Sequence, residues 1–120
     1  MGNLSHIAVI IAVADMSPMV AYFVQLLGFQ IYFQTQDPVD YVVLKRDGIT
    51  INLTLVDTPI RVSSNNIAYI FCEDVMAMYQ EFQGKGVSFR EELNTTVYGM
   101  KEFVLELPSG HRLAFGQGAS

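Results

Sequence analysis

The sequence contains no tryptophan, one cysteine and only two histidines. The single cysteine, Cys72, excludes an internal disulfide framework and any cluster of thiolate metal ligands. Because a free cysteine in an apolar stretch behaves as a small hydrophobic side chain, we expect Cys72 to be buried and structural.

Positive charge is also scarce. The chain has 7 Lys and Arg against 12 Asp and Glu, so its formal net charge is −5. This balance argues against nucleic acids and anionic membranes as partners, and it is compatible with a cationic ligand. The longest apolar run, "IAVIIAVA" at 7–14, is too short to span a bilayer. We therefore expect a soluble, cytoplasmic protein.

The chain is rich in apolar residues, which make up 51% of it, and these follow one order of elements twice. The first half predicts a strand at 5–13 and a helix with Ser17 as N-cap and Pro18 as first helical residue, ending at Gly28. Three strands follow, at 29–35, 40–46 and 49–56. The second half predicts a strand at 66–72, a helix from about 74, and strands at 87–91, 100–107 and 111–116.

Turn and cap residues repeat with the same period. Asp15 aligns with Asp74, Gly28 with Gly86, and the hairpin glycine Gly48 with Gly110. The sequence therefore predicts an α+β fold built by tandem duplication of a βαβββ unit. We expect one domain, 1–120, with half-units 1–57 and 65–120 joined by a polar loop.

Each helix can cover only one face of its sheet. Side chains at alternate positions of a strand share a face, and the more apolar of the two alternating sets should face the helix. These residues are Ile7, Val9, Ile11, Val13, Phe29, Ile31, Phe33, Phe103, Leu105 and Leu107. The other set should line a concave trough, through Tyr32, Gln34, Tyr41, Val43, Thr50, Asn52, Thr54, Ile67, Tyr69, Phe71, Glu102, Val104, Glu106, Arg112 and Ala114. A mostly uncharged trough with several aromatic rings is typical of a small-molecule site. The same composition also suits a dry core or a dimer interface, and both alternatives stay open.

The duplicated plan, with "VADM…AYFVQLLGF", "FCEDVMAMYQEFQGKGV" and the ending "YGMKEFVLELPSGHRLAFG", resembles the vicinal oxygen chelate superfamily. That superfamily includes glyoxalase I, extradiol dioxygenases, fosfomycin-resistance enzymes and bleomycin resistance proteins. The resemblance covers nearly the whole chain and implies curved mixed sheets that enclose a cavity or groove. A fold of this kind does not by itself imply an activity.

The enzymes of that superfamily hold a divalent metal through His, Gln or Glu on the first and last strands of each half. The resemblance places Ala8, Asn52, Ile67 and Ala114 at those positions. Transition metals need imidazole, carboxylate or thiolate donors, so this set predicts no metal site and no cofactor. His6 and His111 do not replace the missing ligands, because neither has a carboxylate fixed beside it by the sequence.

The segment "VYGMKEFVLELPSG" is similar to one of the metal-free bleomycin-resistance branch, with Tyr98 where that branch has a drug-stacking Trp. It differs by one extra residue between the Gly and the Glu-Phe pair, and by Leu107 in place of Asp. With no Trp in the chain, the ligand predicted here is a flat aromatic molecule whose identity is open.

The leading hypothesis is therefore non-catalytic sequestration of a small flat aromatic, and possibly cationic, molecule in the grooves of a homodimer, as in antibiotic resistance by drug binding. The predicted ligand-binding residues are Tyr98, Tyr32, Gln34, Tyr41, Asn52, Tyr69, Phe71, Glu102, Glu106 and Arg112. Pairing of Glu102 and Glu106 with Lys45, Lys101 or Arg112 is an equally open role. Three alternatives remain: a metal-dependent glyoxalase-like or thiol-transferase-like enzyme with unconventional ligands such as His6 and His111, metal-free acid–base catalysis, and a dimerisation module without a ligand.

Overall fold

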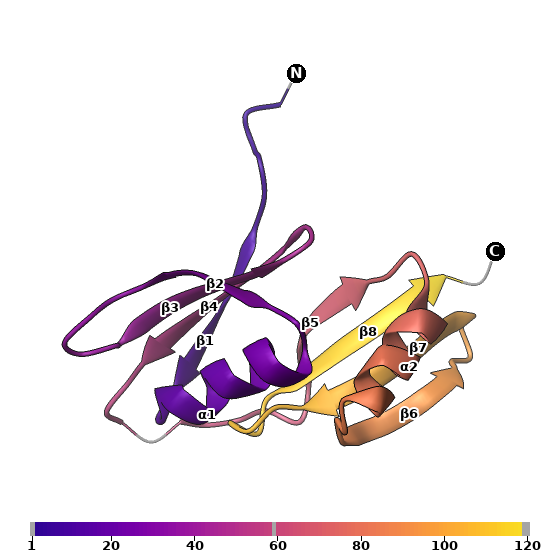
Figure 1. Cartoon of the computed structure of the whole chain (residues 1–120). Coiled ribbons are helices and arrows are strands. Elements are labelled where there is room, and N and C mark those ends of the chain that lie inside the picture. Colours follow the sequence, from indigo (N-terminus) through magenta and orange to yellow (C-terminus); the bar gives the residue numbers. More distant parts are fainter. Residues whose placement is uncertain (1, 59, 119–120) are drawn as a thin grey trace. The chain divides into compact units, whose positions relative to one another are not determined.

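Two units, Met1–Ile60 and Arg61–Ser120, make up the chain in this computed structural model, which describes residues 2–58 and 60–118 (Figure 1). The elements of unit 1 are β1 (Ala8–Val13), α1 (Met16–Ala21), the π-helical turn η1 (Tyr22–Leu26), β2 (Gln30–Gln34), β3 (Tyr41–Arg46) and β4 (Ile49–Leu55). The elements of unit 2 are β5 (Asn66–Phe71), α2 (Val75–Gly84), β6 (Phe89–Thr95), β7 (Met100–Glu106) and β8 (Arg112–Gly118).

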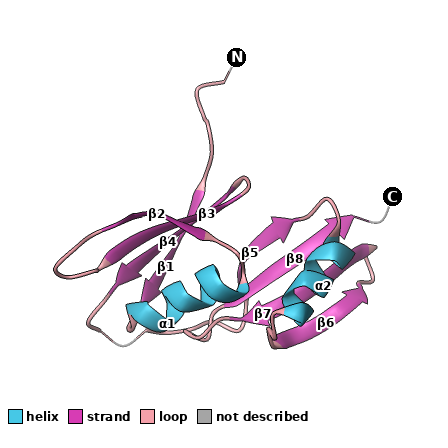
Figure 2. Cartoon of the chain, viewed as in Figure 1, coloured by secondary structure: helices cyan, strands magenta, loops and turns pink. Residues whose placement is uncertain are grey.

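The two units have the same sheet topology. The strand order is β1-β4-β3-β2 in unit 1 and β5-β8-β7-β6 in unit 2. In each sheet the first and last strands of the unit pair in parallel, and the other pairs are antiparallel. Each unit has its helix against one face of its own sheet (Figure 2). The predicted α+β fold with a duplicated βαβββ plan is confirmed.

The repeated turn and cap residues occupy equivalent positions around the helices. Asp15 and Asp74 are the N-caps of α1 and α2, and both have extended backbones. Gly28 and Gly86 follow the helices with φ of 75° and 81°, a region that suits glycine. The hairpins differ, because the residue with positive φ is Asp47 in the first and Gly110 in the second.

Several predicted boundaries were wrong, among them the end of β6, which lies at Thr95 instead of 91. The helix in unit 1 is capped by Asp15 rather than Ser17, so Pro18 lies in the first turn, where its missing N–H leaves no intrahelical bond unmade. β1 begins at Ala8 instead of 5, because its parallel partner β4 begins at Ile49 and Ala8 already pairs with Thr50. Val87 is not in a strand, since its N–H donates to the Phe82 carbonyl (3.0 Å) and closes the end of α2.

A β-bulge in β2 overturns part of the predicted face pattern. Ile31 pairs with Leu44, but Phe33 pairs with Val43 and Gln34 with Val42, so the register shifts by one residue between Ile31 and Phe33. Such a shift exchanges the two faces of a strand. Phe33 therefore leaves the helix side and is 53% exposed, whereas Gln34 moves onto the helix side.

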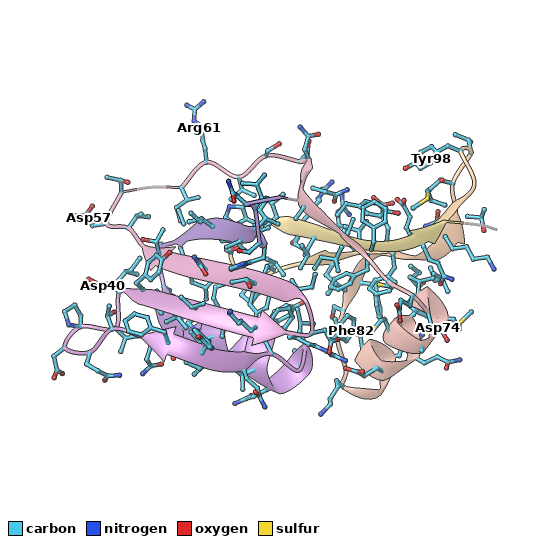
Figure 3. All side chains as sticks on the ribbon, turned by 90° about the horizontal axis from the view of Figure 1, so that it is seen from above. Asp40, Asp57, Arg61, Asp74, Phe82 and Tyr98 are labelled. Carbon is cyan, nitrogen blue, oxygen red and sulfur yellow. The ribbon has the colours of Figure 1, made fainter. Side chains whose placement is uncertain are left out.

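β7 and β8 follow the predicted alternation, whereas a register shift interrupts it at Ile67 in β5, and Ile7 lies before β1 and is 81% exposed. In unit 2, Phe103, Leu105 and Leu113 are fully buried on the helix side. Phe82 of α2 packs edge-to-face on Phe103 and Phe115, with ring centroids 5.9 and 5.4 Å apart. Figure 3 shows Phe82 on this helix and Asp74 at its start. The cores of both units thus lie between helix and sheet. The strand residues between the core residues point to the opposite face of each sheet.

No helix in the described part of the chain is long and apolar enough to cross a membrane.

Cys72, expected to be buried, is only half-buried, and its Sγ lies 3.8 Å from the Ile70 carbonyl oxygen.

Candidate functional site: an aromatic cluster around a buried carboxylate

The face of each sheet that lies opposite its helix is called here the helix-free face. Strand register defines it, because directly paired residues share a face and neighbours along a strand alternate. In unit 1 it comprises Ala8, Ile10, Ala12, Phe33, Tyr41, Val43, Lys45, Thr50, Asn52 and Thr54. In unit 2 it comprises Tyr69, Phe71, Glu102, Val104, Glu106, Arg112, Ala114 and Gly116.

Glu102 is the most unusual side chain on the helix-free face of unit 2. This carboxylate is only 8% exposed, although charged side chains are seldom buried without partners. The Tyr69 hydroxyl donates to its Oε1 at 3.0 Å, and the Tyr98 hydroxyl approaches the same oxygen at 3.4 Å. Within residues 2–58 and 60–118, no Lys or Arg forms an ion pair with Glu102. The predicted alternative of a basic partner for Glu102 is therefore wrong.

Aromatic rings surround this carboxylate. Tyr69 and Phe71 project from alternate positions of β5, and their ring centroids are 4.9 Å apart at an interplanar angle of 50°. Tyr98 comes from the loop between β6 and β7, where Figure 3 shows it at the end of the sheet. Phe71 and Tyr98 are 74% and 69% exposed. These three rings and Glu102 form one group, which we call the Glu102 cluster.

Small residues on β8 make room for the cluster. Tyr69 pairs with Ala114, and Phe71 with Gly116. A Cβ built on Gly116 would overlap the Tyr69 hydroxyl, so only glycine lets this side chain pass over β8 towards Glu102 on β7. The signal available in the sequence was the alternation of Ala114 and Gly116 on one face of a strand.

The cluster also controls the ionisation of Tyr69. Desolvation, followed by the hydrogen bond to Glu102 and the negative charge of that carboxylate, raises the pKa of Tyr69 to about 12. The phenol, which is protonated at neutral pH in any tyrosine, therefore keeps its proton for donation to Glu102 further into the alkaline range.

Within unit 2, Glu106 and Arg112 make other contacts than those of the Glu102 cluster. Glu106 is 4.0 Å from Arg90 in an exposed ion pair, and Arg112 donates to the Ser64 carbonyl at 2.8 Å. In unit 1, Lys45 Nζ lies 4.2 Å from the centroid of the Tyr32 ring, a cation–π contact that the sequence did not reveal.

Asn52 and Tyr41 form a separate polar pair on the helix-free face of unit 1. The Asn52 Nδ2 donates to the Tyr41 hydroxyl at 2.8 Å. The Asn52 Oδ1 is buried and has no hydrogen-bond partner among the described residues. This pair offers hydrogen bonds but no charge.

Gln34 lines a groove on the helix side of unit 1 instead of the helix-free face. The groove has a volume of about 700 Å³ and lies between α1, η1 and the neighbouring strands. Its lining residues are Ala14, Asp15, Met16, Ser17, Val20, Ala21, Val24, Gln25, Ile31, Gln34, Val39 and Leu55. The β2 bulge thus removes Gln34 from the predicted site.

The residues at the superfamily's metal-ligand positions do not suit a divalent metal. Ala8 and Ala114 carry no donor, Ile67 lies at the register irregularity of β5, and Asn52 supplies one neutral amide oxygen. Among the described residues, no group of three or more His, Cys, Asp or Glu side chains could hold an ion. His6 and His111 hydrogen-bond to Ser5 and Ser109 at 2.8 and 2.7 Å, and desolvation lowers the pKa of His111.

Comparison with known proteins points to one superfamily. The family model described as "Glyoxalase/Bleomycin resistance protein/Dioxygenase superfamily" matches residues 3–115. A search of curated proteins found none that matches the chain.

Solved structures share the fold at low sequence identity. A glyoxalase/bleomycin resistance protein/dioxygenase from Alicyclobacillus acidocaldarius is 21% identical, with a TM-score of 0.82 over 97% of this chain and 92% of that one. TioX from Micromonospora sp. ML1 is 18% identical, with a TM-score of 0.77 over 96% and 99%. The bleomycin-binding protein of Streptomyces verticillus, solved with copper(II)-bleomycin, is 18% identical, with a TM-score of 0.77 over all of both chains.

Proposed function

Because the chain belongs to the glyoxalase/bleomycin resistance protein/dioxygenase superfamily, we propose that it binds a small flat aromatic molecule without changing it chemically. The superfamily name covers both enzymes and binding proteins, so membership alone does not decide between them. One observation carries the proposal: Tyr69, Phe71 and Tyr98 gather on a helix-free sheet face, with two of the three rings largely exposed.

Stacking is the mechanism that this surface supports. An aromatic ring laid on Phe71 or Tyr98 removes apolar area from water, and a favourable ring–ring geometry adds about 0.5–1.5 kcal/mol. The angle of 50° between Tyr69 and Phe71 gives the surface two differently inclined walls. Such walls favour planar ligands over flexible aliphatic ones, because a rigid plane loses little entropy on binding.

The donor set favours binding over metal-dependent catalysis. Ala8, Asn52, Ile67 and Ala114 together offer one amide oxygen, and the Glu102 carboxylate is engaged by tyrosine hydroxyls. The bleomycin-binding protein of Streptomyces verticillus, solved with copper(II)-bleomycin, is a precedent for a small-molecule ligand on this fold. The proposed role is sequestration, such as occurs in resistance to a toxic compound.

We also propose that the functional form is a homodimer whose grooves draw on both chains. Ile10 and Phe33 lie on the helix-free face of unit 1 and are 65% and 53% exposed. Exposed apolar side chains gathered on sheet faces are characteristic of surfaces that associate.

The test is the thermal midpoint of the purified protein against bleomycin, against planar aromatic drugs, and against Zn²⁺, Ni²⁺ and Mn²⁺, each with and without a chelator. A ligand specific for the folded state adds about 2.7 kcal/mol at a hundredfold excess over Kd, which raises the midpoint by several degrees. We expect a rise with a planar drug that the chelator does not change.

Two variants make this test specific. Phe71→Leu removes an exposed ring of the cluster and should reduce the drug-dependent rise, whereas Met76→Leu, on the exposed side of α2, should leave it unchanged. A rise with metal alone that the chelator removes would instead favour the enzymatic alternative and overturn the interpretation of the four ligand positions.

A further inference from the structure

The directions of the hydrogen bonds in the Glu102 cluster restrict what a ligand can offer it. Each tyrosine has one hydroxyl proton, and both Tyr69 and Tyr98 direct theirs to Glu102 Oε1. The oxygen atoms of the two phenols are therefore left with lone pairs only. A group that approaches them must donate a hydrogen bond or carry positive charge.

The electrostatics of the cluster select the same kind of group. Glu102 is almost fully buried, and its negative charge has no basic partner among the described residues. A buried charge without a counter-ion is costly, so a cation nearby is favoured. Tyr69 is a phenol and is neutral at pH 7, so it adds no second negative charge beside Glu102.

The aromatic walls add a third preference. The faces of Tyr69, Phe71 and Tyr98 carry the negative lobe of the ring quadrupole, and an ammonium group over such a face gains about 0.5–2 kcal/mol, depending on desolvation. Metal cations suit the cluster less well, because it offers one carboxylate and no further charged ligand. These features together describe a subsite for an organic cation.

We propose that Tyr69, Tyr98 and Glu102 bind the ammonium group of an arylalkylamine, whose N–H groups donate to the two phenol oxygens and whose charge is balanced by Glu102. This inference rests on the proposed function and specifies its ligand class. The site discriminates by charge: amines bind, neutral isosteres bind less tightly, and carboxylates are excluded.

Three matched probes test this charge preference: 1-naphthylmethylamine, which is protonated at pH 7, the neutral 1-naphthalenemethanol, and the anionic 1-naphthoate. Their shared ring keeps stacking nearly constant, and the naphthyl fluorescence anisotropy reports binding directly. Because hydrogen bonds to charged groups are the stronger ones, we expect the amine to bind about tenfold more tightly than the alcohol. The naphthoate should bind most weakly.

Variants assign the preference to the cluster. Glu102→Gln keeps the shape of the side chain and should bring the amine-to-alcohol ratio close to one. Tyr69→Phe should also lower it, and Tyr98→Phe should lower it less, because its contact with Glu102 is longer. Tyr98 is exposed, so its variant tests the site even if a substitution at Glu102 disturbs folding.

Two controls remove the same groups elsewhere in unit 2. Tyr79→Phe deletes another phenol–carboxylate hydrogen bond, 3.0 Å to Glu92, on the helix side of the sheet. Glu92→Gln removes the exposed carboxylate at the other end of that hydrogen bond. Both should keep the tenfold ratio, because neither touches the Glu102 cluster.

The outcomes separate this inference from the proposed function. Equal binding of amine and alcohol, a ratio that survives Glu102→Gln, or tight binding of the naphthoate would overturn the cation subsite and leave aromatic binding intact. If none of the three probes binds at millimolar concentration, both the proposed function and the subsite are wrong.

Discussion

At the scale of the residue, the absence of a side chain at Gly116 is what allows Tyr69 to reach Glu102. The φ angle of Gly116 is not in the positive region, so its backbone does not require glycine. The constraint comes from the neighbouring strand instead, because the Tyr69 hydroxyl occupies the place of a Cβ. Gly116 contributes no functional group to the Glu102 cluster, but the space that it leaves decides the position of Tyr69.

Gly116→Ala should therefore displace Tyr69 and weaken its hydrogen bond to Glu102. Overpacking of this kind typically lowers the free energy of unfolding by about 1–3 kcal/mol, which urea denaturation would measure. Gly118→Ala is the matched control on the same strand, because its Cβ would meet only Met100 Sδ, at 3.8 Å.

The two variants separate a steric effect from the loss of a glycine. If Gly116→Ala is no less stable than Gly118→Ala, Tyr69 does not lie over β8. In a Tyr69→Ala background, Gly116→Ala should lower the free energy of unfolding much less than in the wild type, since the ring that collides with the new Cβ is absent.

At the scale of the element, the two helices are equivalent in position and different in their construction. α2 has ten residues, whereas α1 has six and continues as a π-helical turn of five. Both begin after an extended aspartate, but only Asp74 caps with its side chain, accepting from the Ala77 N–H at 3.1 Å. The aspartate at this duplicated position therefore stabilises its helix through a side-chain cap in unit 2 and not in unit 1.

Asp74→Ala should consequently lower the free energy of unfolding by about 1 kcal/mol, the usual cost of losing an N-cap, whereas Asp15→Ala should lower it by less. Urea denaturation of the two variants measures the difference, and Asp74→Ser, which retains a capping oxygen, should restore most of the loss. Equal effects at the two aspartates would contradict the distinction drawn from their hydrogen bonds.

At the scale of the whole molecule, each unit presents a sheet face that its own helix does not cover. The side chains on these faces include Ile10 and Phe33, which are more exposed than apolar residues of this size usually are. Burial of such faces between two chains would remove this apolar area from water.

Sedimentation should accordingly give a mass about twice that of the 13.4 kDa chain at micromolar concentration. Ile10→Asp places a charge on the helix-free face of unit 1 and should shift the protein towards the monomer. Met76→Asp, at a half-exposed position of α2, is the control that should remain dimeric. A wild-type protein that sediments as a monomer would refute the homodimer.

Much of the fold could be predicted from the alternation of apolar and polar residues along the strands and from the turn and cap residues between elements. Phe103 and Leu105 lie two residues apart on β7, and this alternation alone predicts that both face the helix, where both are buried. The same alternation placed Glu102 on the helix-free face. Phe33 and Gln34 could not be assigned correctly, because the bulge between them and Ile31 depends on how β2 pairs with β3.

The sequence by itself determined the order of elements, their duplication, and which side chains are available, because these depend on local periodicity and on turn residues. Only the tertiary structure decided which of those side chains meet. Tyr69 and Glu102 are 33 residues apart, and they come together because β8 lies between β5 and β7 and carries glycine at the crossing point. That encounter depends on strand order and on the space left by a neighbour, two properties that no single stretch of sequence contains.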